Sequence, residues 1–147
     1  MEMKAPLDVP RLLSMSQAEL DELFRNSPPG EIPDGEAKGT AIVAPGTTYT
    51  EDVAEFIQHF AWKGKSFDAA KGVLRNRILP LGLNAIIARV YKAPSWLDGK
   101  ECIVLDYSET SLVARWIRDE IRQIGPRMYL GKVYWDKKRL IDFALQF

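Results

Sequence analysis

The pattern of apolar and polar positions predicts a short helix near the start of the chain. Ser16 and Glu19 have the spacing of a capping box, and Leu20, Leu23 and Phe24 form an apolar stripe behind it. The letters NSPPG that follow cannot continue a helix. We therefore expect a helix that begins at Ser16, followed by an extended connection.

A second stretch with helical spacing covers residues 50–62. Val53, Ile57 and Phe60 fall near one side, and Thr50 stands ahead of two acidic residues as a plausible N-cap. We expect a second helix here.

Most of the remaining chain has the pattern of short strands separated by turns. Turn letters such as AAKG, LGLN, LDGK and DKK leave little chain between the strands, so the strands must pair antiparallel. The predicted strands cover residues 36–45, 62–68, 73–80, 85–94, 101–108, 128–135 and 139–147.

Residues 111–124 stand between two of these strands and fit a helix better than a strand. A helix places Trp116, Ile117 and Ile121 on one side, with Gly125 and Pro126 as a stop signal. A strand would put Arg115, Asp119 and Gln123 on the same face as Val113, Ile117 and Ile121, which is poor alternation. We predict a helix, with a strand paired to residues 128–135 as the alternative.

These elements predict an α+β fold that is mainly antiparallel β. We expect a curled sheet or a small β-barrel with two N-terminal helices and one helix before the last hairpin. The length of 147 residues fits one domain. Residues 1–34 would form a helix and an extended arm, and residues 36–147 would form the barrel-like core.

Composition and charge exclude several classes of function. Twenty basic and twenty acidic residues cancel, which disfavours nucleic-acid binding. No apolar run is long enough to cross a bilayer and the start does not resemble a secretory signal, so we expect a cytoplasmic, soluble protein. Cys102 and His59 are the only residues of their types, and no nucleotide-binding motif is present, so we expect neither metal nor cofactor.

Three predicted strands each carry one charge inside an apolar run. These charges are Arg89, Asp106 and Asp142. A buried charge needs an opposite charge or hydrogen bonds, so Arg89 and Asp106 could form a polar cluster inside a pocket. The alternative is that these residues lie on the outer face of a one-sided sheet.

Aromatic residues are numerous for a small β protein and provide candidates for a ligand pocket. A hydrophobic ligand would contact some of them, while the others form the core. Arg75 and Arg77 are two residues apart, so they share a strand face and could hold a carboxylate. A solvated basic strand edge is the alternative. The candidate ligand-binding residues are Trp62, Arg77, Arg89, Tyr91, Trp96, Asp106, Tyr129 and Tyr134.

The candidate catalytic residues are Asp106, Tyr107 and His59. Asp106 and Tyr107 stand together at the end of a predicted strand, where the mouth of a pocket is expected. His59 could act as a general base near neutral pH. The alternative is a histidine that lies on the surface or takes part only in helix packing.

The letters AWKGKSFDAAKGVL and YLGKVYW carry a family resemblance. Trp62, Gly64, Lys65, Phe67 and Gly131 fit a tryptophan strand that leads into a barrel and a closing hairpin. In this respect residues 60–147 resemble the GxWxG-type bacterial lipocalin-like domains. The resemblance implies a small β-barrel with a cavity for a hydrophobic ligand.

The sequence predicts two alternative functions. The first is the binding of a small, largely hydrophobic molecule, with a carboxylate or hydroxyl group held by an arginine or a tyrosine. The alternative is a small cofactor-independent isomerase, cyclase or dehydratase that uses an aspartate, tyrosine or histidine as a proton shuttle. A third option is an interaction domain that docks through residues 111–124, and a homodimer is left open.

Overall fold

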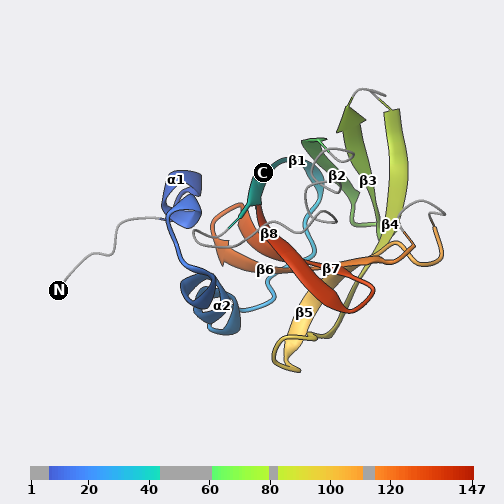
Figure 1. The fold of residues 1–147 in the computed structure, drawn as a ribbon. Coiled ribbons are helices and arrows are strands. Elements are labelled where there is room, and N and C mark those ends of the chain that lie inside the picture. Colours follow the sequence, from blue (N-terminus) through green and yellow to red (C-terminus); the bar gives the residue numbers. More distant parts are fainter. Residues whose placement is uncertain (1–6, 44–60, 80–82, 111–114) are drawn as a thin grey trace.

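Eight antiparallel strands close into a barrel in which each strand pairs with its neighbours in chain order (Figure 1). The computed structural model describes residues 7–43, 61–79, 83–110 and 115–147, with the backbone alone described at 61–64, 76–79 and 83–86. The strands are β1 (Gly35–Ile42), β2 (Ala61–Asp68), β3 (Val73–Leu79), β4 (Leu83–Pro94), β5 (Glu101–Asp106), β6 (Ile117–Gly125), β7 (Met128–Trp135) and β8 (Lys138–Gln146).

The barrel closes because β1 pairs with a different strand in each half. Its first residues pair with β2, where Gly35 lies opposite Phe67. Its later residues pair with β8, where Ile42 lies opposite Asp142. This stagger leaves no free sheet edge among the described strands, as closure of a tilted barrel requires.

Alternate residues of the strands point inward and form one apolar cluster. Period-two alternation accounts for the set, since every second residue of a strand faces the same side. The buried members are Ala37, Phe67, Leu74, Ala88, Val90, Ile103, Leu105, Tyr107, Ile117, Ile121, Tyr129, Val133, Ile141, Phe143 and Leu145.

Two N-terminal helices, α1 (Val9–Leu13) and α2 (Gln17–Arg25), precede the barrel and lie outside it (Figure 1). Leu12, Leu20 and Phe24 pack in a second apolar cluster with outward residues of the strands, among them Val104 and Leu130. The predicted capping box of Ser16 and Glu19 is confirmed at the start of α2. Helix α1 was not predicted, and the helix predicted over residues 50–62 lies outside the described residues, apart from its end, which belongs to β2.

Within the described residues, the seven predicted strands are confirmed as β1 to β5, β7 and β8. The helix predicted over residues 111–124 is wrong, because residues 117–125 form β6 and pair with both β5 and β7. Residues 111–114 lie outside the described residues. Trp116, expected on the buried side of that helix, is 52% exposed in the turn before β6.

Several buried charges fix the helices and turns to the outside of the barrel. Lys132 on β7 donates hydrogen bonds of 2.6 Å to both Asp21 on α2 and Asp142 on β8. Arg122 on β6 donates to both carboxylate oxygens of Asp98 and to the backbone oxygen of Phe24 at the end of α2. The bonds from Arg122 lower the pKa of Asp98 to about 2.

Among the described residues, no helix combines the length and the apolar character that a membrane-spanning helix needs.

Candidate functional site

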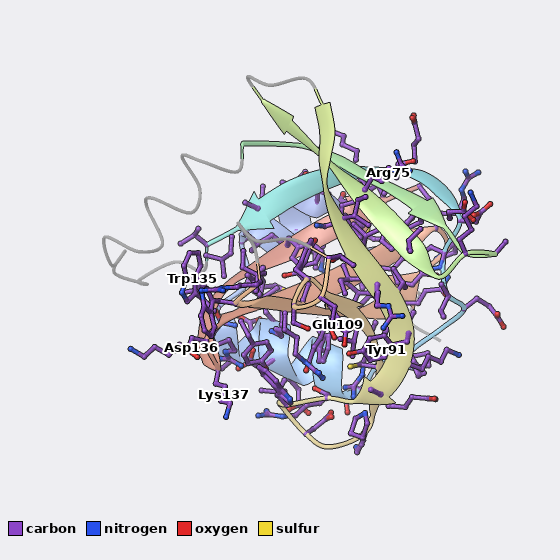
Figure 2. All side chains as sticks on the ribbon, turned by 90° about the vertical axis from the view of Figure 1, so that its right-hand side faces the viewer. Arg75, Tyr91, Glu109, Trp135, Asp136 and Lys137 are labelled. Carbon is purple, nitrogen blue, oxygen red and sulfur yellow. The ribbon has the colours of Figure 1, made fainter. Side chains whose placement is uncertain are left out.

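Arg89, Tyr91 and Asp106 lie on the outer face of β4 and β5. Arg89 is directly opposite Asp106 in the register, as a polar cluster would require, but it pairs instead with Glu109 at 2.6 Å. Figure 2, viewed from the side of β3 and β4, shows Tyr91 and Glu109 on this face. The outer-face alternative therefore describes these residues, and Asp142 likewise lies outside the barrel, beneath α2.

Asp106 is held as an ionised carboxylate on this outer face. Partial burial raises its pKa, but hydrogen bonds from Ser108 and from the Tyr91 hydroxyl, at 2.6 and 2.7 Å, lower the pKa further than burial raises it. The pKa of Tyr91 rises to about 12 through burial and the neighbouring carboxylate. Asp106 is thus unsuited to donate a proton near neutral pH.

Trp96 and Tyr134 also lie outside the barrel, where they attach the turn between β4 and β5. Their rings meet edge to face with centroids 5.2 Å apart, and the Arg118 guanidinium lies 4.3 Å from the centroid of the Trp96 ring. Buried Glu120 accepts hydrogen bonds from the Ser95 hydroxyl and the Trp96 backbone N–H. These contacts give Trp96 and Tyr134 a structural role, which is to hold the turn between β4 and β5 against the barrel.

Tyr129 points into the barrel and helps to close one end of it. Its hydroxyl donates a hydrogen bond of 2.6 Å to the backbone oxygen of Glu31. The ring of Phe147 packs 5.5 Å from the rings of both Tyr129 and Phe67. The arm before β1 and the last residue of the chain therefore cover this end.

Among the candidates whose side chains the structure describes, Tyr107 is the one that reaches a polar site inside the barrel. Its hydroxyl forms hydrogen bonds with Lys65 and Asp119, and we call these three residues the interior polar centre. The Lys65 ammonium donates to the Tyr107 hydroxyl at 3.0 Å, and this hydroxyl donates to Oδ2 of Asp119 at 3.3 Å. Lys65 Nζ lies 3.5 Å from the same oxygen.

The interior polar centre lies across the barrel from β2 to β6 and is shielded from water. Lys65 and Asp119 are each 1% exposed. Ile117 and Ile121 flank Asp119 on the inward face of β6, and Lys65 Nζ lies 5.5 Å from the centroid of the Phe143 ring. Because Tyr107 follows β5 and Asp119 is near the start of β6, the centre lies toward the end of the barrel opposite Phe147.

Burial shifts the titration of both charged groups in the interior polar centre. It raises the pKa of Asp119 to about 6, although Lys65 and the Tyr107 hydroxyl act in the opposite direction. Burial also lowers the pKa of Lys65 despite the nearby carboxylate. A carboxyl group that titrates near neutral pH can both accept and donate a proton.

The two oxygens of the Asp119 carboxylate differ in their hydrogen bonding. Within the described part of the chain, Oδ1 of Asp119 is buried and has no hydrogen-bond partner. Buried polar atoms are nearly always paired, so each exception calls for a specific reason. A carboxylate oxygen in this position can accept a further hydrogen bond.

Three sequence-predicted residues are not placed in this site. His59 lies outside the described residues, and Trp62 and Arg77 are described by their backbone alone, in β2 and β3. Trp62 pairs with Ile78, and Arg77 pairs with Gly64.

Lys65 and Asp119 were missed as site residues, although the sequence carried a signal for each. Lys65 is part of the WKGKSF pattern that supported the family resemblance. Asp119 is the polar residue that interrupts the inward row of Ile117 and Ile121 when β6 is read as a strand. This interruption was one of the reasons to prefer a helix, so the residue that marks the candidate site also helped to conceal the strand.

A surface recess of about 460 Å³ lies apart from this centre, at the starts of β1 and β3 and the end of β2. Asp34 and Asp68 line it, and both accept hydrogen bonds from backbone N–H groups of the turn between β2 and β3. Their carboxylates thus have a structural role. No group of three potential metal ligands occurs in the described part of the chain.

Comparison with known proteins supports the fold and leaves the function open. The structure is similar to the crystal structure of a protein from Thermomonospora curvata, with a TM-score of 0.65 and 19% sequence identity. The match covers 90% of this chain and 88% of that one. No family model and no curated protein matches the sequence. At this level of identity the likeness shows the fold alone.

Proposed function

We propose that this chain is a lipocalin-like binding protein that holds a small, largely apolar molecule inside the barrel. The observation that carries the proposal is the interior polar centre, in which a carboxylate oxygen of Asp119 lacks a partner among the described residues. Eight strands give a barrel interior that side chains can just fill or that can hold one small ligand. A mostly apolar pocket with a few polar groups is the usual form of such a site.

The energetics of buried charge support a functional role for this centre. A buried ion pair seldom stabilises a protein more than apolar side chains of the same volume would. The buried charges outside the barrel, such as Arg122 and Lys132, join helix α2 to the strands. Lys65 and Asp119 instead join two strands that the sheet already holds in place, so binding is a better reason for their presence.

A fluorescent probe tests this proposal. N-phenyl-1-naphthylamine is neutral and apolar, and its emission rises in an apolar environment. We expect saturable binding with about one site per chain. Binding that never saturates, or none at all, would contradict the proposal.

Two variants test whether the probe binds inside the barrel. Leu105→Trp fills the interior, since Leu105 is fully buried there, and should reduce the affinity at least about tenfold. Leu13→Trp changes an exposed residue of α1 and serves as the control. Circular dichroism and thermal unfolding establish that each variant is folded. If Leu105→Trp does not fold, the stoichiometry of the wild type still decides.

Proton-transfer catalysis is a second candidate, because Asp119 titrates at about 6 beside Tyr107. A carboxylate of this kind could remove a proton from the carbon next to a carbonyl group. The Tyr107 hydroxyl and the Lys65 ammonium would then stabilise the negative charge that forms on the carbonyl oxygen. Return of the proton to a different carbon would complete an isomerisation.

Hydrogen exchange into an apolar ketone separates catalysis from binding alone. In D₂O, a catalytic centre should incorporate deuterium next to the carbonyl of 2-decanone faster than buffer does, as mass spectrometry would detect. Asp119→Asn should abolish the excess exchange, whereas Asp106→Asn on the outer face should leave it unchanged. Exchange at the buffer rate in the wild type would leave binding as the function.

A further inference from the structure

We infer that the bound molecule is neutral and presents a hydrogen-bond donor, as an apolar alcohol or amide does, to Oδ1 of Asp119. The inference rests on the proposed function and specifies the ligand class, which the sequence had left open between a carboxylate and a hydroxyl group. It follows from three features of the interior polar centre: its unpaired acceptor, its charge balance and its surroundings.

The unpaired atom is an acceptor. Oδ2 of Asp119 already faces the Tyr107 hydroxyl and the Lys65 ammonium, at 3.3 and 3.5 Å. Oδ1 has no partner in the described part of the chain and is closed off from solvent. An ionised carboxylate can only accept hydrogen bonds, so the group that satisfies Oδ1 must bring an N–H or O–H. A buried acceptor left unpaired costs about 1–3 kcal/mol, which a matching donor recovers.

The charge balance of the centre favours a neutral ligand. Lys65 and Asp119 carry opposite charges and are the buried charged residues of the barrel interior among those described. A fatty acid would bring a second carboxylate beside Asp119, together with acceptor oxygens that cannot satisfy Oδ1. A cationic amine would leave a net charge in an apolar interior, which is costly.

The surroundings require the rest of the molecule to be apolar. Ile117 and Ile121 are the inward-facing neighbours of Asp119 on β6. Leu105 on β5 and Val133 on β7 lie opposite Asp119 in the register and also face inward. Such a lining offers contact to hydrocarbon and no further hydrogen bonds. One donor on an aliphatic or aromatic body therefore matches the site.

Three ten-carbon compounds test the inference by displacing N-phenyl-1-naphthylamine. 1-Decanol has one donor, methyl nonyl ether is its isomer without a donor, and decanoic acid is ionised at pH 7.5. We expect 1-decanol to displace the probe at a concentration about tenfold lower than either of the others, which is the worth of one buried hydrogen bond.

Substitutions at two aspartates assign the preference to one atom. Asp119→Leu removes the acceptor at similar volume and should bring 1-decanol and the ether to within about twofold of each other. Asp106→Asn, on the outer face, should keep the tenfold preference. If Asp119→Leu does not fold, the comparison of alcohol and ether on the wild type remains decisive.

The outcomes separate this inference from the proposed function. Equal displacement by alcohol and ether would overturn the inference and leave hydrophobic binding in place. Displacement at the lowest concentration by decanoic acid would also overturn it, because the recognising group would then be the Lys65 ammonium. Failure of the probe to bind saturably would overturn the proposed function and the inference together.

Discussion

Asp119 and Asp106 are both strand-borne aspartates next to a tyrosine, yet their surroundings give them opposite properties. Asp106 is on the outer face, where hydrogen bonds from Ser108 and Tyr91 lower its pKa. Asp119 is inside the barrel, where burial raises its pKa to about 6. The face of the strand therefore decides which carboxylate can take part in chemistry near neutral pH.

This difference predicts opposite effects of pH on stability. The folded pKa of Asp119, about 6, exceeds its unfolded value of 3.8, so its contribution to stability is complete below 3.8 and is lost as pH rises through 6. A difference of about two in pKa corresponds to at most about 3 kcal/mol. The free energy of unfolding of wild type minus that of Asp119→Asn should thus fall between pH 4 and pH 7, as measured by urea denaturation.

Asp106→Asn provides the matched control. The folded pKa of Asp106 is lowered, so its contribution is present above the unfolded value and is lost as pH falls through the folded one. The corresponding difference should therefore decrease toward acid pH. The same slope for both variants would mean that Asp119 is not desolvated as described.

At the level of elements, seven strands could be predicted because short turns and alternation agree along the sequence. The strand β6 could not, because both of its faces are buried. Its inward face includes Asp119 between two isoleucines, and its outward face includes Glu120 and Arg122 beneath other elements. Because polar residues are buried on both faces, the apolar and polar residues of β6 do not alternate in the way that predicts a strand from the sequence.

The outward face of β6 makes a specific prediction about how α2 is held. Arg122 is 1% exposed and donates to Asp98 and to backbone oxygens of Phe24, Lys100 and Glu101. Arg122→Met should lower the free energy of unfolding by about 2–5 kcal/mol, because it removes the opposite charge from the largely buried Asp98 side chain and all five of these hydrogen bonds. Chemical denaturation measures this loss.

Arg89→Met is the control for this prediction. Arg89 also pairs with a carboxylate, Glu109, but both side chains are mostly exposed. An exposed ion pair of this kind is worth at most about 1 kcal/mol. Similar losses for the two arginine variants would show that Arg122 does not anchor the helix.

At the scale of the whole molecule, the sequence predicted a curled antiparallel sheet or a barrel, and the structure establishes the closed form. Closure depends on the pairing of β1 with β8, which are far apart in the chain and carry no local signal for each other. The candidate site could not be predicted for the same reason. Lys65 and Asp119 meet only because β2 and β6 face each other across the barrel, which the spacing of residues in the sequence does not reveal.

The most direct test of the central claim is to observe where a ligand lies. With ¹³C-labelled isoleucine and leucine methyl groups, NMR can detect nuclear Overhauser effects between the protein and bound 1-decanol. We predict contacts from the ligand to the inward methyl groups of Leu105, Ile121 and Ile141, and none to Leu12 or Leu20 beneath the helices. Contacts confined to the outer methyl groups would contradict an interior binding site.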